Sequence, residues 1–257
     1  MWGTISTTDE LKPKLNWGAV REIFVKDLQE LSKNRYVFYS MLILPCLLVG
    51  VTLINTYSTL SNPQISAAQI SILISTVSET VIIVPAIVSV LIGSTSVVIE
   101  KNNRSLEPLL ATPITDSELL VGKALAPFVP GLGIGLVSYT AIIIGVDVLT
   151  YPVYHAFILP TPILLYQMLV LAPLVGLFGT FVALFISTKI KDVRAAQQVS
   201  TFAVLPLFFV LIFASFFLTS TLDLLFALTL ILVVAIVGFV RLTISQFKRE
   251  SILVSWK

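Results

Sequence analysis

The chain has 257 residues, of which 56% are hydrophobic and 12% charged, and its mean hydropathy is +0.99. Soluble domains carry about 25% charged residues, so this sequence cannot cover a water-facing surface, and an ordinary soluble fold is excluded. The formal net charge is +2, and the single cysteine and single histidine exclude an intrachain disulfide and a histidine-based metal cluster. We predict an all-α integral membrane protein.

The first predicted element is an amphipathic helix over residues 17–34. Its apolar side chains recur at helical spacing on one narrow face, whereas the charged residues lie away from it. We expect the helix to lie in the headgroup plane with this face toward the acyl chains, and a simple topogenic anchor is the alternative. The face consists of Trp17, Val20, Phe24, Leu28 and Leu31.

Six apolar runs follow, and each approaches the length of about 20 residues that crosses a bilayer. Cys46 lies inside the first run, where we expect a small buried hydrophobe. Asp147 and Asp223 stand at the ends of runs that face the outside, and we expect both to be solvated. The predicted spans are residues 36–56, 72–98, 123–146, 160–187, 199–219 and 223–241.

The positions of the basic residues predict the orientation. All 16 lysines and arginines fall within residues 1–35, 99–123, 188–198 and 241–257. The connections 57–71, 147–159 and 220–222 contain none. Because cytoplasmic loops carry the excess of Lys and Arg, we predict a multi-pass protein of the plasma membrane with both termini in the cytoplasm.

The connection between the second and third spans has an unusual pattern. Glu107 and Pro108 suit a first helical turn, and Leu109 and Leu110 continue it as a short apolar turn. Pro113 then ends the turn. Two leucines exposed on the cytoplasmic side need cover, either from lipid or from a soluble partner, although a plain structured loop is the alternative.

A second helix begins just after this turn. Thr115 and Glu118 have the T-x-x-E spacing of a capping box. The helix then continues through Leu119 and Leu120 into the third span.

These features resemble the permeases of the type-two ABC transporter family. The resemblance rests on the amphipathic helix, six spans with both ends inside, and one connection. In the family this connection has a charged stretch, here Glu100–Arg104, then a Leu-rich turn with Thr-Pro, here Leu106–Pro113, then a helix that ends in Gly-Lys, here Gly122–Lys123. A Gly-Thr pair that is common after the charged stretch is replaced by Arg104–Ser105–Leu106, and the last outer turn is unusually short.

The resemblance implies that residues 1–257 form one permease domain with six transmembrane helices and a cytoplasmic coupling helix. A separate ATP-binding cassette ATPase would seat this helix, bind ATP and Mg²⁺, and drive transport, most members being exporters. A second permease half and membrane lipids would be the other partners, and nucleic acid would not be one. The expected ATPase contacts are Glu100, Arg104, Glu107, Pro108, Leu109, Leu110, Thr112, Pro113 and Glu118.

The sequence itself contains no G-x-x-x-x-G-K-[ST] phosphate loop and no catalytic set that we can propose. We therefore expect a non-catalytic subunit without cofactor or metal of its own. A self-sufficient secondary carrier or channel is the alternative function. The spans offer few of the ionisable groups that carriers place near the midplane.

Two intramembrane features remain. Glu79 lies in the second span among hydroxyl residues, and a charged group there should face protein or a water-filled pathway. A position at the outer interface is the alternative. Gly131 and Gly135 form a G-x-x-x-G pattern, which predicts close helix packing.

Overall fold

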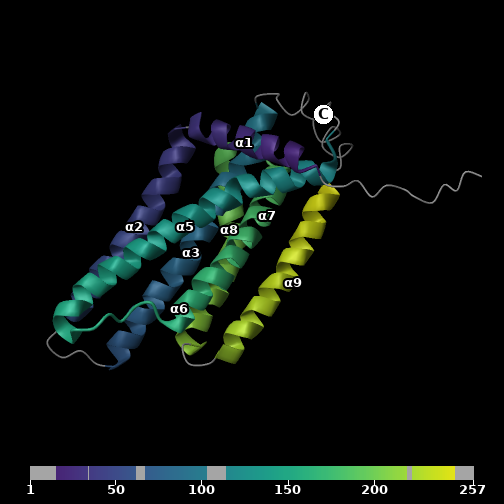
Figure 1. Ribbon diagram of the computed structural model, residues 1–257. Helices are drawn as coiled ribbons and strands as arrows, with labels where there is room; N and C mark the ends of the chain where they lie inside the picture. The colour runs from purple at the N-terminus through teal and green to yellow at the C-terminus, as the bar shows by residue number, and fades with distance from the viewer. Residues whose placement is uncertain (1–15, 34, 62–66, 103–113, 219–221, 247–257) are drawn as a thin grey trace, which may run out of the picture.

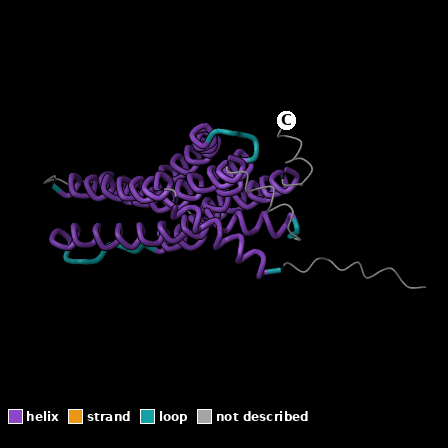
Figure 2. Tube along the Cα trace, turned by 90° about the horizontal axis from the view of Figure 1, so that it is seen from above, coloured by secondary structure: helices purple, strands orange, loops and turns teal. Residues whose placement is uncertain are grey.

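The computed structural model describes residues 16–33, 35–61, 67–102, 114–218 and 222–246. Within these ranges the chain consists of helices and loops, without strands (Figure 2). The predicted all-α architecture is therefore confirmed for this part of the chain. The Leu-rich turn 106–113 and the last outer turn fall outside it.

Helix α1 (Trp17–Lys33) lies across one end of a bundle, and we call this end the α1 end (Figure 1). The other helices run along the bundle and alternate in direction. Among the described residues, six helical stretches are long and apolar enough to cross a membrane. They are α2 (Arg35–Leu60), α3 (Ala67–Asn102), α5 (Asp116–Tyr154), the continuous stretch α6–η1–α7 (Pro162–Tyr166, Gln167–Leu171 and Ala172–Ser187), α8 (Val193–Leu218) and α9 (Leu222–Gln246).

Helix α3 forms the centre of the bundle and packs against α5 and α7 through glycines. A Cβ on Gly135 would lie 2.8 Å from Pro85 Cγ of α3, and one on Gly179 of α7 would lie 2.8 Å from Val90 Cγ2. A Cβ on Gly131 would lie closer still to the Ser89 hydroxyl and 3.0 Å from the carbonyl oxygen of Pro85. The close packing that the G-x-x-x-G pattern predicts is confirmed, since small residues let helix backbones approach in membranes.

Helices α2, α8 and α9 form the periphery, and less than a quarter of their apolar windows is buried within the chain. Large apolar side chains such as Ile54 and Phe202 are exposed there. Cys46 is exposed as well, so the expected burial of its thiol is wrong. This cysteine lies on an outer helix whose surroundings are lipid or another chain.

The fourth membrane-crossing stretch contains a π-helical turn, η1. The amide of Ala172 donates to the carbonyl of Gln167, five residues earlier. Pro173 follows directly and has no amide to donate. A π turn next to a proline is a known way to accommodate such a break in the helical ladder, so the local sequence accounts for the irregularity.

Asp147 corrects the expected helix end. Helix α5 continues past Asp147 to Tyr154 and stops where His155 adopts a left-handed conformation with φ 51°. The Asp147 side chain is buried, and its Oδ1 accepts hydrogen bonds from the amides of Ile158 (3.1 Å) and Leu159 (3.0 Å). The expectation of a solvated carboxylate is therefore wrong. Its hydrogen bonds hold the loop between α5 and α6 against the helix.

Candidate functional site

Helix α1 packs onto its own chain with a face that differs from the predicted one. Val20, Ile23 and Asp27 are its buried residues. Val20 belongs to the predicted face, but Trp17 of that face is 67% exposed. Ile23 lies in a cluster with Val97 of α3, Leu119 and Leu120 of α5 and Leu184 of α7. The prediction considered apolar residues alone and so missed that the inner face contains a carboxylate.

Gly122 allows α1 and α5 to approach closely. A Cβ at this position would lie 2.8 Å from Ile23 Cγ2 and 2.9 Å from Ile23 Cβ. Contacts below 3.0 Å essentially never occur for real Cβ atoms, so a larger residue would push α1 away. The glycine of the Gly122–Lys123 pair thus has a packing role.

The beginning of α5 is fixed by the predicted capping box. Thr115 is the N-cap, its hydroxyl accepts from the amide of Glu118, and Glu118 Oε2 accepts from the amide of Thr115 at 2.8 Å. Glu118 Oε1 also accepts from the amide of Asn16, at 2.7 Å. The same carboxylate therefore caps α5 and holds the residue that precedes α1.

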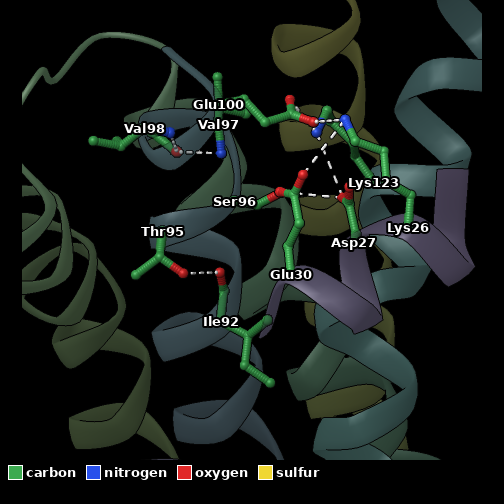
Figure 3. Close-up of polar contacts among 11 residues, drawn as sticks. Lys26, Asp27, Glu30, Ile92, Thr95, Ser96, Val97, Val98, Glu100 and Lys123 are labelled. Atoms are coloured by element: carbon green, nitrogen blue, oxygen red, sulfur yellow. Dashed lines mark hydrogen bonds and ion pairs between the residues drawn. The ribbon is translucent and has the colours of Figure 1, made fainter. Parts of the chain in front are cut away.

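A buried ion-pair cluster joins α1, α3 and α5 at the α1 end (Figure 3). Lys123 of α5 places its Nζ 2.5 Å from Glu100 Oε2 and 3.5 Å from Asp27 Oδ2. Lys26 places its Nζ 2.8 Å from Glu100 Oε1. Lys123 and Glu100 are 1% and 0% exposed, so their charges are satisfied by each other and by α1 rather than by water.

Asp27 is the less well-paired carboxylate of the cluster. Its Oδ2 accepts from Lys123 and from Ser96 of α3, whereas Oδ1 has no hydrogen-bond partner within the described residues. Burial raises the pKa of Asp27; Lys123 opposes this shift, and the negative charge of Glu100 adds to it. Replacement of one charged residue of this cluster by a neutral one would leave its partner charged, buried and without a counter-ion.

The end of α7 is tied to α3 close to this cluster. The hydroxyl of Ser187 accepts from the amides of Val97 and Val98. The ammonium of Lys101 donates to the carbonyls of Ser187 and Thr188, which end α7. Thus α3 is linked to α1 and α5 on one side and to α7 on the other.

The structure divides the predicted contact residues into two groups. Glu100 and Glu118 have buried side chains that bind within the chain, and no exposed carboxylate is available at either position. Lys26 and Lys123 are the partners of Glu100 that the sequence reasoning missed, as it missed Asp27, which shares Lys123 with Glu100. The remaining predicted contacts lie outside the described residues: Arg104, Glu107, Pro108, Leu109, Leu110, Thr112 and Pro113.

Glu79 lies in α3, far from this cluster in the sequence. Its side chain is partly buried, and Oε1 is a buried atom without a hydrogen-bond partner in the described part of the chain. An acidic group without a partner inside a membrane helix is costly. The position thus stays a candidate for the pathway, which no contact in the structure tests.

The sequence matches the model of the ABC-2 family transporter proteins over residues 28–196, well over half of the chain. The chain therefore belongs to the ABC-2 transporter family, and it is a multi-pass membrane protein whose described residues include six membrane-capable helices. Permeases of this family are typically non-catalytic membrane subunits that work with an ATP-binding cassette ATPase. No curated protein matches the sequence.

Proposed function

We propose that this chain is the permease subunit of an ATP-driven exporter in the cell membrane, with a separate ATPase that binds ATP and Mg²⁺. The observation that supports it best is the cluster of Lys26, Asp27, Glu100 and Lys123. This cluster ties the end of α3 and the beginning of α5 to α1. Residues 103–113, which connect α3 to α5, hold the expected coupling helix.

The ion pairs among α1, α3 and α5 would transmit a displacement from the ATPase to the membrane helices. A displacement of residues 103–113 by the ATPase would act on two membrane helices at once, and α1 would move with them as one unit. Ser187 and Lys101 would pass the displacement to α7. A second permease half would face this one, and the transport pathway would open between them.

Co-purification with the ATPase tests the proposal. The chain is expressed together with a candidate ATP-binding cassette subunit from the same organism, and the complex is isolated through a tag on the permease. The double variant Leu109→Asp/Leu110→Asp should lose the ATPase, because carboxylates oppose the burial of this turn in an apolar groove. The matched control Leu109→Met/Leu110→Met keeps the turn apolar and should retain it.

Membrane yield and gel-filtration profile establish that both variants fold. Retention of the ATPase by the aspartate variant would overturn the assignment of the coupling helix. Transport by the chain alone in proteoliposomes, driven by an ion gradient and without ATP, would favour the secondary carrier or channel.

Glu79 is the residue that we propose for the pathway. Glu79→Gln removes the charge and keeps the shape, so transport and substrate-stimulated ATPase activity of the assembled complex should fall. Asp192→Asn, in an exposed turn at the α1 end, is the control. Unchanged activity in Glu79→Gln would exclude a pathway role.

A further inference from the structure

A second feature lies at the end of the bundle opposite α1, where α2, α3 and α5 enclose a cavity. The volume of the cavity is about 80 Å³. Leu60 of α2, Leu73 of α3 and Val146 of α5 line it, and Leu159 of the loop after α5 closes one side. One water needs about 10–15 Å³ of such space, so the cavity has room for a short apolar segment of a ligand.

The cavity offers only carbon to an occupant. Two threonines line it, but the hydroxyl of Thr59 donates to the carbonyl of Asn55, and that of Thr150 donates to the carbonyls of Val146 and Asp147. Water needs two to four polar partners in such a space, and these hydroxyls are already engaged by their own helices. A polar or charged ligand would find no partner here either.

A buried charge maintains the shape of the cavity. Asp147 Oδ1 holds the amides of Ile158 and Leu159, and both residues line the cavity. A hydrogen bond to a charged acceptor is about twice as strong as a neutral one. The wall that the loop provides is therefore fixed in place.

The surroundings indicate which apolar molecule is available. Side chains on the neighbouring surfaces of α2 and α5 are apolar and largely exposed, with Ile54 at 67% and Val148 at 66%. Both helices are long and apolar enough to cross a membrane, so lipid is the apolar molecule that we expect beside the cavity. Tyr154 lines the cavity, and close to it in the sequence the rings of Tyr151 and Phe157 pack at 5.5 Å. Aromatic side chains of this kind mark the level of lipid headgroups.

We propose that this cavity binds a segment of one acyl chain of a membrane phospholipid, with the headgroup near Tyr154. The site lies within a single chain, on α2, α3, α5 and the loop held by Asp147. The proposal does not depend on the ATPase or on transport.

Photolabelling of retained lipid tests the site. The full-length chain is loaded with a phosphatidylcholine that carries a diazirine near the end of one acyl chain. Weakly held lipid is removed by extensive washing in detergent, and the sample is then irradiated and mapped by mass spectrometry. Adducts should concentrate on residues that line the cavity, such as Leu73 and Val146, and excess unlabelled phosphatidylcholine should compete for them.

Leu73→Trp fills the cavity and should lower the retained label by about tenfold, since a loss of about 1.4 kcal/mol in binding has that effect. Ile144→Trp places the same ring on the exposed face of α5, where Ile144 is 65% exposed, and should leave the label unchanged. Leu73→Phe should give an intermediate loss. Unfolding temperatures identify any variant that fails to fold.

Three results would overturn the proposal: no label on the wild-type chain after washing, adducts outside the cavity, or equal labelling of Leu73→Trp and Ile144→Trp when both are folded. Detection of another apolar molecule in place of phospholipid, by native mass spectrometry of the washed chain, would also do so. Each of these results leaves the ATPase partnership untouched, so failure of this site and failure of the proposed function are separate outcomes.

Discussion

Lys123 shows how much one residue depends on its tertiary surroundings. In the sequence it is one more basic residue at the cytoplasmic edge of a span. In the structure it is 1% exposed and lies between Glu100 and Asp27. A buried charge persists only when it is paired and hydrogen-bonded, and here the partners of Lys123 come from two other helices, α1 and α3.

Removal of the Lys123 charge should therefore destabilise the folded chain strongly. Lys123→Met keeps a long side chain but leaves Asp27 without its cation and Glu100 with Lys26 alone. We expect a loss of about 3–5 kcal/mol in the free energy of unfolding, the usual cost of breaking a buried pair from one side. The measurement is denaturant or thermal unfolding of the purified chain in detergent.

Lys33→Met, at an exposed position at the end of α1, provides the matched control and should change the stability little. The double variant Lys123→Met/Asp27→Asn should recover part of the loss, because it removes the carboxylate that the first change leaves unpaired. Equal stabilities of the Lys123→Met and Lys33→Met variants would show that the cluster does not support the fold.

At the scale of elements, α1 behaves as part of the bundle. Its inner face combines Val20 and Ile23 with the charged Asp27, and α5 meets it with Gly122 and Lys123 in succession. Adjacent residues of α5 thus serve two needs: the glycine provides space and the lysine provides charge. The Gly-Lys pair, read in the sequence only as part of a family pattern, has a physical explanation in this contact.

Gly122→Ala should loosen the attachment of α1. The added Cβ would lie within 3.0 Å of Ile23, and overpacking of this kind costs about 1–3 kcal/mol. Gly133→Ala is the control, since a Cβ there meets nothing within 4 Å. An alanine in place of an exposed helical glycine should leave stability unchanged or raise it by up to about 1 kcal/mol.

A double-mutant cycle with Ile23→Ala isolates the contact. The combined variant should lose less stability than the two single losses added together, since Ile23→Ala removes part of the atoms that the new Cβ meets. Additive losses, or a loss in Gly133→Ala as large as that in Gly122→Ala, would contradict the close contact.

Local features were predictable from the sequence, and features that depend on distant partners were not. The capping box at Thr115 and Glu118 and the glycine packing of α5 against α3 follow from spacing within one segment, and both are present. The ion pair of Asp27 with Lys123 joins residues 96 positions apart. Neither segment reveals its partner by itself.

The Asp147 prediction failed for a related reason. A single carboxylate at the end of an apolar run resembles a solvated helix end. In the structure the helix continues past it, because the carboxylate finds its partners in the backbone amides of a later loop. A pattern of residue types does not show that a loop returns to cover them.

At the scale of the whole molecule, the ion pairs that join helices in the described part of the chain lie at the α1 end. The beginning of α1 and the end of α9, at Trp17 and Gln246, both lie at the α1 end (Figure 1). The distribution of Lys and Arg assigns this end to the cytoplasm, by the positive-inside rule. The orientation is a proposal that can be tested directly.

Cysteine labelling tests the orientation with a matched pair. Ser32 of α1 and Ser58 of α2 are exposed serines, and each donates its hydroxyl to the carbonyl three residues earlier. In a Cys46→Ser background, Ser58→Cys should react with a membrane-impermeant maleimide on intact cells. Ser32→Cys should react only after the membrane is permeabilised, and the reverse pattern would invert the orientation.

The charged residues of the buried cluster are synthesised at different times during translation. The ribosome makes Lys26 and Asp27 first, then Glu100, and Lys123 last. During translation, the two carboxylates must stay hydrated or share Lys26 until the first turns of α5 emerge and bring the second cation. Complete charge pairing is then available before α7, α8 and α9 have been made, so the first three membrane helices can assemble with α1 as an early unit onto which the rest of the chain packs.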